Sequence, residues 1–366
     1  MRNIKLLLVL LICILFTTCS NKNKSTIIKG SISNLPNGIL YIYQNNSSQR
    51  IDSVKTIDGH FEIKHIWNIK DLPSYIGIDH VDEKGILRAF SFPTNAKYRN
   101  GKWESQFFMS DSLVVINGEI KDFNSKNIQL SEKYKLITSP TIKAGKQTEA
   151  LFDIDADLFE KITDTTFSIV KGKIIKYPYS YHLLYKISEN KNSFSAQQLG
   201  DLLKSFKGEI RQSDIYKITD TYNKKRFNIK DIKLPLLEDI HNNRKDILDK
   251  KYKTHLVIFW ASWCSPCREE IPMLKKIYQL YNKDIEFISI SIDTDRKAWK
   301  KALKDENMDW KQLIISKKTS ENEALQIHFK LNGAIPYTVL VDNNLEILSS
   351  SVGLTNEKEL EKLILK

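Results

Sequence analysis

The sequence predicts a multi-domain chain with an N-terminal all-β module, a mainly helical middle segment and a C-terminal α/β domain. Three observations indicate this class. The chain has 366 residues, more than one ordinary hydrophobic core organises. Short apolar runs separated by Asn-Gly and Asp-Gly pairs fill its first third, and after residue 251 apolar runs of strand length alternate with amphipathic runs.

The first eighteen residues predict a targeting segment. Arg2 and Lys5 form a positively charged start, and an apolar run of secretory length spans 6–16. A membrane-spanning anchor, which needs about 20 apolar residues, is the alternative that this short run disfavours. The segment ends at Cys19 before a polar run, and this ending resembles the signal of bacterial lipoproteins. The resemblance implies that residues 1–18 are removed and that Cys19 carries the lipid.

Residues 25–118 predict a β-sandwich-like N-terminal module. Asn37-Gly38 and Asp58-Gly59 are turn signals between short apolar runs, as in hairpins of antiparallel sheets. The expected strands are 27–32, 39–43, 60–64, 75–78 and 113–116.

Residues 120–228 predict a mainly helical spacer. Apolar residues recur every three to four positions over 151–162 and 181–187. This spacing favours packing over a cofactor site. The candidate helix caps are Ser180 and Ser195, the latter in a capping box with Gln198.

Residues 229–366 predict an α/β domain that begins within a polar connection at 228–250. Alternating strands and helices favour one sheet with helices on both faces. The expected strands are 255–260, 285–291, 337–341 and 346–351, and the expected helices are 266–282, 296–306, 321–329 and 357–365.

The pair Cys264 and Cys267 lies between the first of these strands and the first helix. A helix N-terminus presents free N–H groups and the positive end of the dipole, which favour a thiolate on Cys264. Cysteines so placed have pKa values of roughly 3.5–7.5, and only the thiolate attacks a disulfide. Half of a zinc site or a structural disulfide is the alternative, but apart from this pair no cysteine lies beyond Cys19. The pattern therefore favours redox chemistry.

Three segments of the domain carry a family resemblance. Residues 259–268 resemble the active-site segment of thioredoxin-like proteins, above all of exported TlpA/ResA-type thiol-disulfide oxidoreductases. Residues 335–338 are similar to the loop whose proline is cis and lies against the cysteines, and 290–299 to a strand and helix of that branch. Through the pattern of Gly30, 35–38, 52–53 and 58–61, the N-terminal module resembles an uncharacterised β domain found ahead of thioredoxin-like domains in Bacteroidetes lipoproteins.

The resemblance implies how the pair would work. Cys264 would be the exposed thiolate that attacks a client disulfide, and Cys267 would then resolve the mixed disulfide. Pro336 would leave its neighbouring backbone free to pair with an extended client segment, whereas a plain turn is the alternative. Trp260 and Trp263 would shield the cysteines or merely pack.

Glu270 matches a glutamate that lies near the cysteines in the same branch, whereas the position of the buried Asp of cytosolic thioredoxins holds Ile258 here. A buried carboxylate at Glu270 could take the proton of Cys267, because burial raises its pKa toward the working range. The alternative is a solvated side chain like that expected of Glu269.

These roles predict a protein-disulfide reductase of the cell envelope. Ser265-Pro266 lacks the His of strongly oxidising members, and a Pro there is typical of reducing ones. The expected partners are exported proteins with disulfides, including apocytochrome c, and a membrane electron donor. The alternatives are a disulfide isomerase or oxidase on the same fold and a lipid-anchored binding or scaffold protein.

Charge and anchoring complete the expectations. The formal net charge is +12, but the lysines are spread evenly, which favours a solvated surface over nucleic-acid binding. No metal and no cofactor are expected. A lipid on Cys19 would hold the protein in the envelope facing the periplasm, and Ser20 slightly favours the outer membrane.

Overall fold

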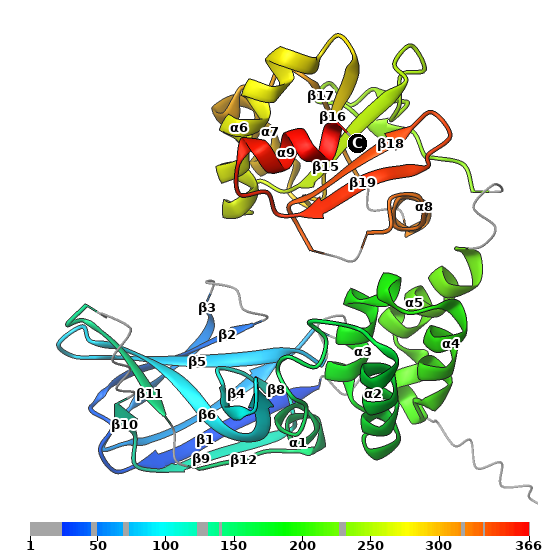
Figure 1. Cartoon of the computed structure of the whole chain (residues 1–366). Coiled ribbons are helices and arrows are strands. Elements are labelled where there is room, and N and C mark those ends of the chain that lie inside the picture. The colour runs from blue at the N-terminus through cyan, green and yellow to red at the C-terminus, as the bar shows by residue number, and fades with distance from the viewer. Residues whose placement is uncertain are drawn as a thin grey trace, which may run out of the picture. The chain divides into compact units, whose positions relative to one another are not determined.

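The computed structural model describes residues 24–44, 50–68, 73–122, 131–138, 141–226, 232–315, 319–331 and 334–365. The predicted signal segment 1–18 and the lipidation site Cys19 lie outside the described residues. The chain divides into two compact units, the first running to Thr94 and including Glu104–Glu149, the second comprising Asn95–Trp103 and Ala150–Lys366 (Figure 1). In the part of the chain described, no helix is both long enough and apolar enough to cross a membrane.

The N-terminal β region contains two sheets, one with the strand order β12-β9-β1-β4 and one with β10-β11-β6-β5-β2-β3, in which β7 pairs with β6 and β8 with β5. Buried and exposed residues alternate along β1 and β4, as in sheets with one face in a core. The expected all-β module is confirmed, and each predicted strand is present. The strands are β1 (Ser25–Ile32), β2 (Gly38–Gln44), β3 (Arg50–Thr56), β4 (His60–Ile66), β5 (Tyr75–Asp82), β6 (Leu87–Tyr98), β7 (Gly101–Ser105), β8 (Phe108–Met109), β9 (Leu113–Gly118), β10 (Lys121–Asp122), β11 (Tyr134–Thr138) and β12 (Thr141–Lys143).

Strands continue past residue 118, where the sequence pattern places the end of the β module. β11 pairs in parallel with β6, and β12 pairs antiparallel with β9. Both strands are short, and they are held in place by pairing with strands that are distant in the sequence. Local sequence patterns do not reveal pairing between distant strands. The first helix therefore begins at Lys146, later than the predicted start of the helical segment at residue 120.

The middle segment is helical from Lys146 onward, and its two predicted caps are confirmed. Ser180 accepts a hydrogen bond from the Leu183 N–H at 3.2 Å, and Ser195 forms a capping box with Gln198. The helices are α1 (Lys146–Phe152), α2 (Asp164–Lys176), α3 (Tyr181–Glu189), α4 (Ala196–Ser205) and α5 (Asp214–Lys225), with 3₁₀ turns at Lys191–Ser193 and Gly208–Gln212.

The helix expected over 151–162 is wrong, because α1 ends at Phe152 and turns follow. The Ala156 N–H donates to the Lys97 carbonyl at 2.8 Å, and the Asp155 carboxylate accepts from the Lys97 N–H at 2.8 Å. Hydrogen bonds to β6 thus replace the helical ladder that the apolar spacing suggested.

The C-terminal domain contains a seven-stranded sheet with the order β14-β13-β17-β16-β15-β18-β19. Its central strands β15, β16 and β17 are parallel, and β18 is antiparallel to β15. All strands and helices predicted here are present, whereas β13, β14 and β17 were not predicted. The elements are β13 (Leu237–Glu238), β14 (Arg244–Lys245), β15 (Thr254–Trp260), α6 (Ser265–Tyr281), β16 (Ile285–Ser291), α7 (Arg296–Glu306), β17 (Lys311–Ile314), α8 (Thr319–His328), β18 (Tyr337–Asp342), β19 (Ile347–Val352) and α9 (Glu357–Ile364).

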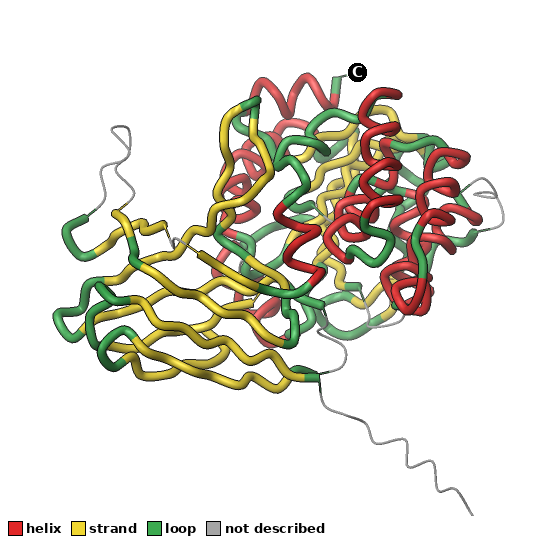
Figure 2. Tube along the Cα trace, turned by 90° about the horizontal axis from the view of Figure 1, so that it is seen from below, coloured by secondary structure: helices red, strands yellow, loops and turns green. Residues whose placement is uncertain are grey.

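Helices cover both faces of this sheet, as predicted. On one face Ile258 of β15 packs in a buried cluster with Leu274 of α6 and Leu360 of α9. On the other face Phe259 packs in a cluster with Leu325 of α8. Figure 2 shows the strands of the β region and, elsewhere in the chain, the seven-stranded sheet of the C-terminal domain among helices.

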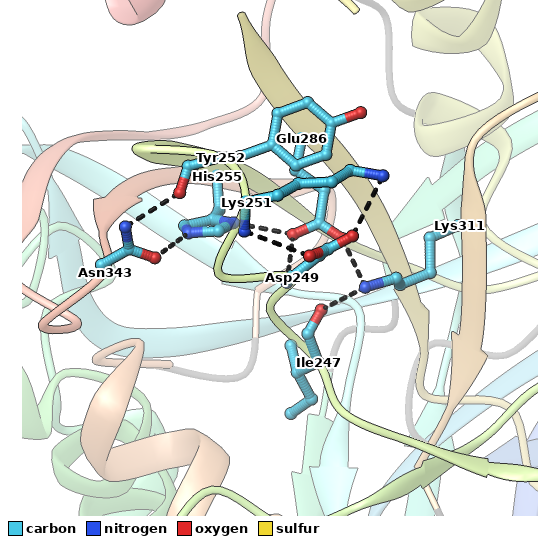
Figure 3. Close-up of polar contacts among 8 residues, drawn as sticks. All are labelled: Ile247, Asp249, Lys251, Tyr252, His255, Glu286, Lys311 and Asn343. Carbon is cyan, nitrogen blue, oxygen red and sulfur yellow. Dashed lines mark hydrogen bonds and ion pairs between the residues drawn. The ribbon is translucent and has the colours of Figure 1, made fainter.

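A buried polar network ties the beginnings of β15 and β16 together (Figure 3). His255 is fully buried, and its Nδ1 lies 2.7 Å from Glu286 Oε2 while its Nε2 lies 3.0 Å from Asn343 Oδ1. Glu286 also accepts the Asp249 N–H at 2.7 Å and pairs with the Lys311 ammonium. Burial works to raise the pKa of Glu286, but the bonds from these partners outweigh it and hold that pKa below its ordinary value.

Candidate functional site

The two cysteines lie at the beginning of α6. β15 ends at Trp260, a turn closes with the Cys264 N–H donating to the Ala261 carbonyl at 3.1 Å, and Cys264 is the N-cap of the helix. Its Sγ accepts the Cys267 N–H at 3.2 Å. The structure shows the pair as a disulfide with an S–S distance of 2.01 Å. The predicted strand–turn–helix setting of the pair is therefore present.

The expectation that Cys264 is exposed is wrong for this oxidised pair. Cys264 is 5% exposed and Cys267 is 3% exposed, so their burial hardly differs. Both sulfur atoms pack in a cluster that includes Trp260 and Trp299. Trp263 is 68% exposed, so the structure brings Trp260 to the cysteines and leaves Trp263 at the surface.

Pro336 lies at the same end of the sheet. The Ile335–Pro336 peptide bond is cis, as the resemblance implied, and Tyr337 directly after it pairs with Phe259 near the end of β15. Ile335 packs against the cluster that holds the cysteines, and the Pro336 carbonyl accepts the Gly353 N–H at 3.0 Å. The cis-proline loop thus borders the segment that leads to the cysteine pair.

Glu270 follows Cys267 by one turn of α6 and is 6% exposed. Its Oε1 accepts the Leu354 N–H at 2.6 Å, whereas its Oε2 is buried and has no hydrogen-bond partner among the residues the structure describes. Burial raises the pKa of Glu270 to about 7, against the opposing effect of the Leu354 hydrogen bond. The surface position considered as the alternative does not hold.

A groove of about 1040 Å³ runs past this carboxyl group and is lined by Glu270, Pro336 and Leu354 among others. Sequence reasoning singled out the first two and missed the second wall of the groove, which continues through Asn356 and Lys358. Nothing in the sequence around 353–358 suggests a site, because the segment reaches the groove only through the pairing of β18 with β19.

The comparison with known families decides the nature of this domain. Residues 252–347 match the family model described as thioredoxin-like. These residues form a thioredoxin-like domain.

Known proteins similar to the chain include the thiol-disulfide oxidoreductase ResA, a thioredoxin-like protein and a thiol:disulfide interchange protein. ResA of a Bacillus cereus strain is 24% identical over 132 residues, which cover 36% of this chain and 73% of ResA. The thioredoxin-like protein YneN of Bacillus subtilis (strain 168) is 25% identical over 152 residues, covering 40% of this chain and 86% of YneN. A solution structure of a thiol:disulfide interchange protein from Bacteroides sp. is 27% identical with a TM-score of 0.31, covering 36% of this chain and 86% of that one.

The thioredoxin-like domain therefore belongs to a protein-disulfide oxidoreductase. Its cysteine pair can exist as a disulfide or as two thiols, a difference of two electrons and two protons. Because Glu270 has a pKa of about 7, it can gain or lose a proton near neutral pH within one helical turn of Cys267.

Proposed function

We propose that the protein reduces disulfides of exported proteins. In the reduced enzyme the Cys264 thiolate attacks one sulfur of the client disulfide, which forms a mixed disulfide and releases the other client sulfur as a thiolate. The Cys267 thiolate then attacks Cys264 Sγ, so the client leaves as a dithiol and the pair closes to a disulfide. Two electrons pass to the client, and a membrane electron donor must return two electrons to the pair.

The observation that carries this proposal is the placement of the pair at the start of α6 beside the cis-proline loop. Cys264 as N-cap already accepts a backbone N–H, and the same group together with the helix dipole would stabilise its thiolate. The Ser-Pro sequence between the cysteines has no His to stabilise that thiolate further, which favours reduction over oxidation.

We assign Glu270 as the base that accepts the proton of the Cys267 thiol. Cys267 must become a thiolate inside a buried cluster, and apolar surroundings raise the pKa of a thiol. A carboxylate one turn away, whose pKa lies near 7, is matched to this proton transfer. Its free Oε2 is the acceptor we assign.

We infer a location and a class of partners from the first residues of the chain. The apolar run 6–16 and Cys19 support a lipid anchor that faces the periplasm, with the outer membrane slightly favoured by Ser20. Clients would then be exported proteins with disulfides, among them apocytochrome c before haem attachment.

The reduction potential of the pair, measured in the protein without residues 1–19 against a glutathione or dithiothreitol series, tests the direction. We expect a value near that of thioredoxin, about −270 mV. A value of about −120 to −180 mV would contradict reduction and support an oxidase or isomerase. Cys267→Ser should accumulate mixed disulfides with clients, whereas Cys264→Ser should not. If both variants keep full function in cells, the protein is a binding protein.

A further inference from the structure

A second buried carboxylate contacts the segment that leads to Cys264, but it follows strand β16, whereas Glu270 lies on helix α6. Asp293 follows the end of β16 by two residues and is 5% exposed. Its Oδ2 accepts the Ser262 N–H at 2.8 Å and the Ser291 hydroxyl at 2.7 Å, and its Oδ1 accepts the Ser262 hydroxyl at 2.7 Å. The Asp293 N–H donates to Ser291 Oγ at 2.9 Å, which holds the carboxylate in place.

These bonds fasten the segment that carries the attacking cysteine. Ser262 precedes Cys264 by two residues, so their Cα atoms are at most about 7.6 Å apart. The segment is held on one side by the strand, where the Ile292 N–H donates to the Trp260 carbonyl at 3.0 Å. Asp293 holds its middle through both the backbone and the side chain of Ser262.

The chemistry of these contacts separates Asp293 from an ordinary packing residue. Within the described residues, the partners of the buried carboxylate are neutral groups of Ser262 and Ser291. A buried charge without a cation is costly for folding unless its hydrogen bonds are good. Hydrogen bonds to an ionised acceptor are about twice as strong as those between neutral groups. The two bonds from Ser262 to the Asp293 carboxylate therefore restrain the segment that leads to Cys264.

We propose that Asp293 is a positioning residue that holds Cys264 against Cys267 and makes the pair more reducing. The inference rests on the redox role proposed above. Two effects act in the same direction. A fixed Ser262 keeps the two sulfur atoms close, which favours the disulfide over the dithiol. The negative charge disfavours a thiolate on Cys264, and a pair whose thiolate is less stable is a stronger reductant.

The test compares Asp293→Asn, Ser262→Ala and Asp295→Asn in the protein without residues 1–19. We expect Asp293→Asn to change the equilibrium constant with glutathione about tenfold toward the dithiol, a shift of about +30 mV. Ser262→Ala removes one bond and keeps the charge, so its shift should be smaller and of the same sign. Asp295 is the matched control, because its carboxylate only caps α7 through the N–H groups of Lys297 and Ala298.

Thermal unfolding of each variant shows whether it is folded. Should Asp293→Asn fail to fold, the sign of the Ser262→Ala shift decides. An unchanged potential in folded Asp293→Asn, or an equal shift in Asp295→Asn, would overturn the inference. The same measurement on the unmodified protein tests the redox function separately from the role of Asp293. If the unmodified protein shows no reversible thiol-disulfide couple, the proposed redox function itself is refuted.

Discussion

At the scale of single residues, Glu270 combines a functional position with a cost in stability. Its pKa rises from an ordinary 4.5 to about 7 because the carboxyl group is buried. Between these two values the unfolded chain releases the proton while the folded chain keeps it. Folding stability therefore decreases as the pH rises through this window, by at most about 3–4 kcal/mol at about 1.4 kcal/mol per pKa unit.

Glu270→Gln should remove this loss, because the amide keeps an oxygen for the Leu354 N–H and carries no charge. We expect the variant to match the original protein at pH 4 and to exceed its free energy of unfolding at pH 8, while it releases clients from mixed disulfides more slowly. Urea unfolding at a series of pH values measures the first effect. Glu269→Gln is the control, since Glu269 is exposed on the same helical turn, and a similar gain there would contradict the assignment.

At the scale of elements, the network around Glu286 joins three neighbouring strands. It connects His255 of β15 and Lys311 of β17 through a carboxylate on β16. Glu286→Gln would leave a buried imidazole and a half-buried ammonium without their anion. Removing one partner of a buried pair costs about 3–5 kcal/mol, and we expect about 3 kcal/mol here because Lys311 is partly exposed.

The pH dependence gives this prediction a second readout. The pKa of Glu286 is depressed below 4.5, so its contribution is present above that pH and is lost as the pH falls through the lower folded value. The variant should therefore lose less stability between pH 5 and pH 3 than the original protein, as followed by thermal unfolding. Lys251→Gln breaks the exposed pair with Asp249 and should leave the stability almost unchanged at either pH, because water screens exposed ion pairs.

The elements also show what local sequence can predict. The strand before the cysteines and helix α6 are predictable because apolar runs and the Cys-x-x-Cys pair are local signals. The short strand β17 and the groove wall at Leu354 are not, since both are ordered by contacts with distant residues. The hold of Asp293 on Ser262 is hidden for the same reason, because the two residues are 31 positions apart. The burial of Cys264 depends on packing around the closed disulfide, which no motif describes.

At the scale of the whole molecule, the second unit contains both the helical segment and the thioredoxin-like domain. Ile327 of α8 belongs to the same buried cluster as the core residues of α3, α4 and α5. Lys191 is 4% exposed and its ammonium donates to the Leu331 carbonyl at 2.7 Å, just after α8. The helices expected to be a spacer thus share packing and a partly buried hydrogen bond with the redox domain, and we expect the two to unfold together.

Lys191→Met tests this expectation, because it keeps an apolar stem of similar length and leaves the Leu331 carbonyl without its donor. An unsatisfied buried group costs about 1–3 kcal/mol. Amide hydrogen exchange should therefore accelerate about fivefold or more in α3–α5 and, by the same factor, in β15 and β16, because a shared opening event governs both. Lys204→Met is the control, since the Lys204 side chain is 79% exposed. Faster exchange in the helices alone would show that they open independently of the thioredoxin-like domain.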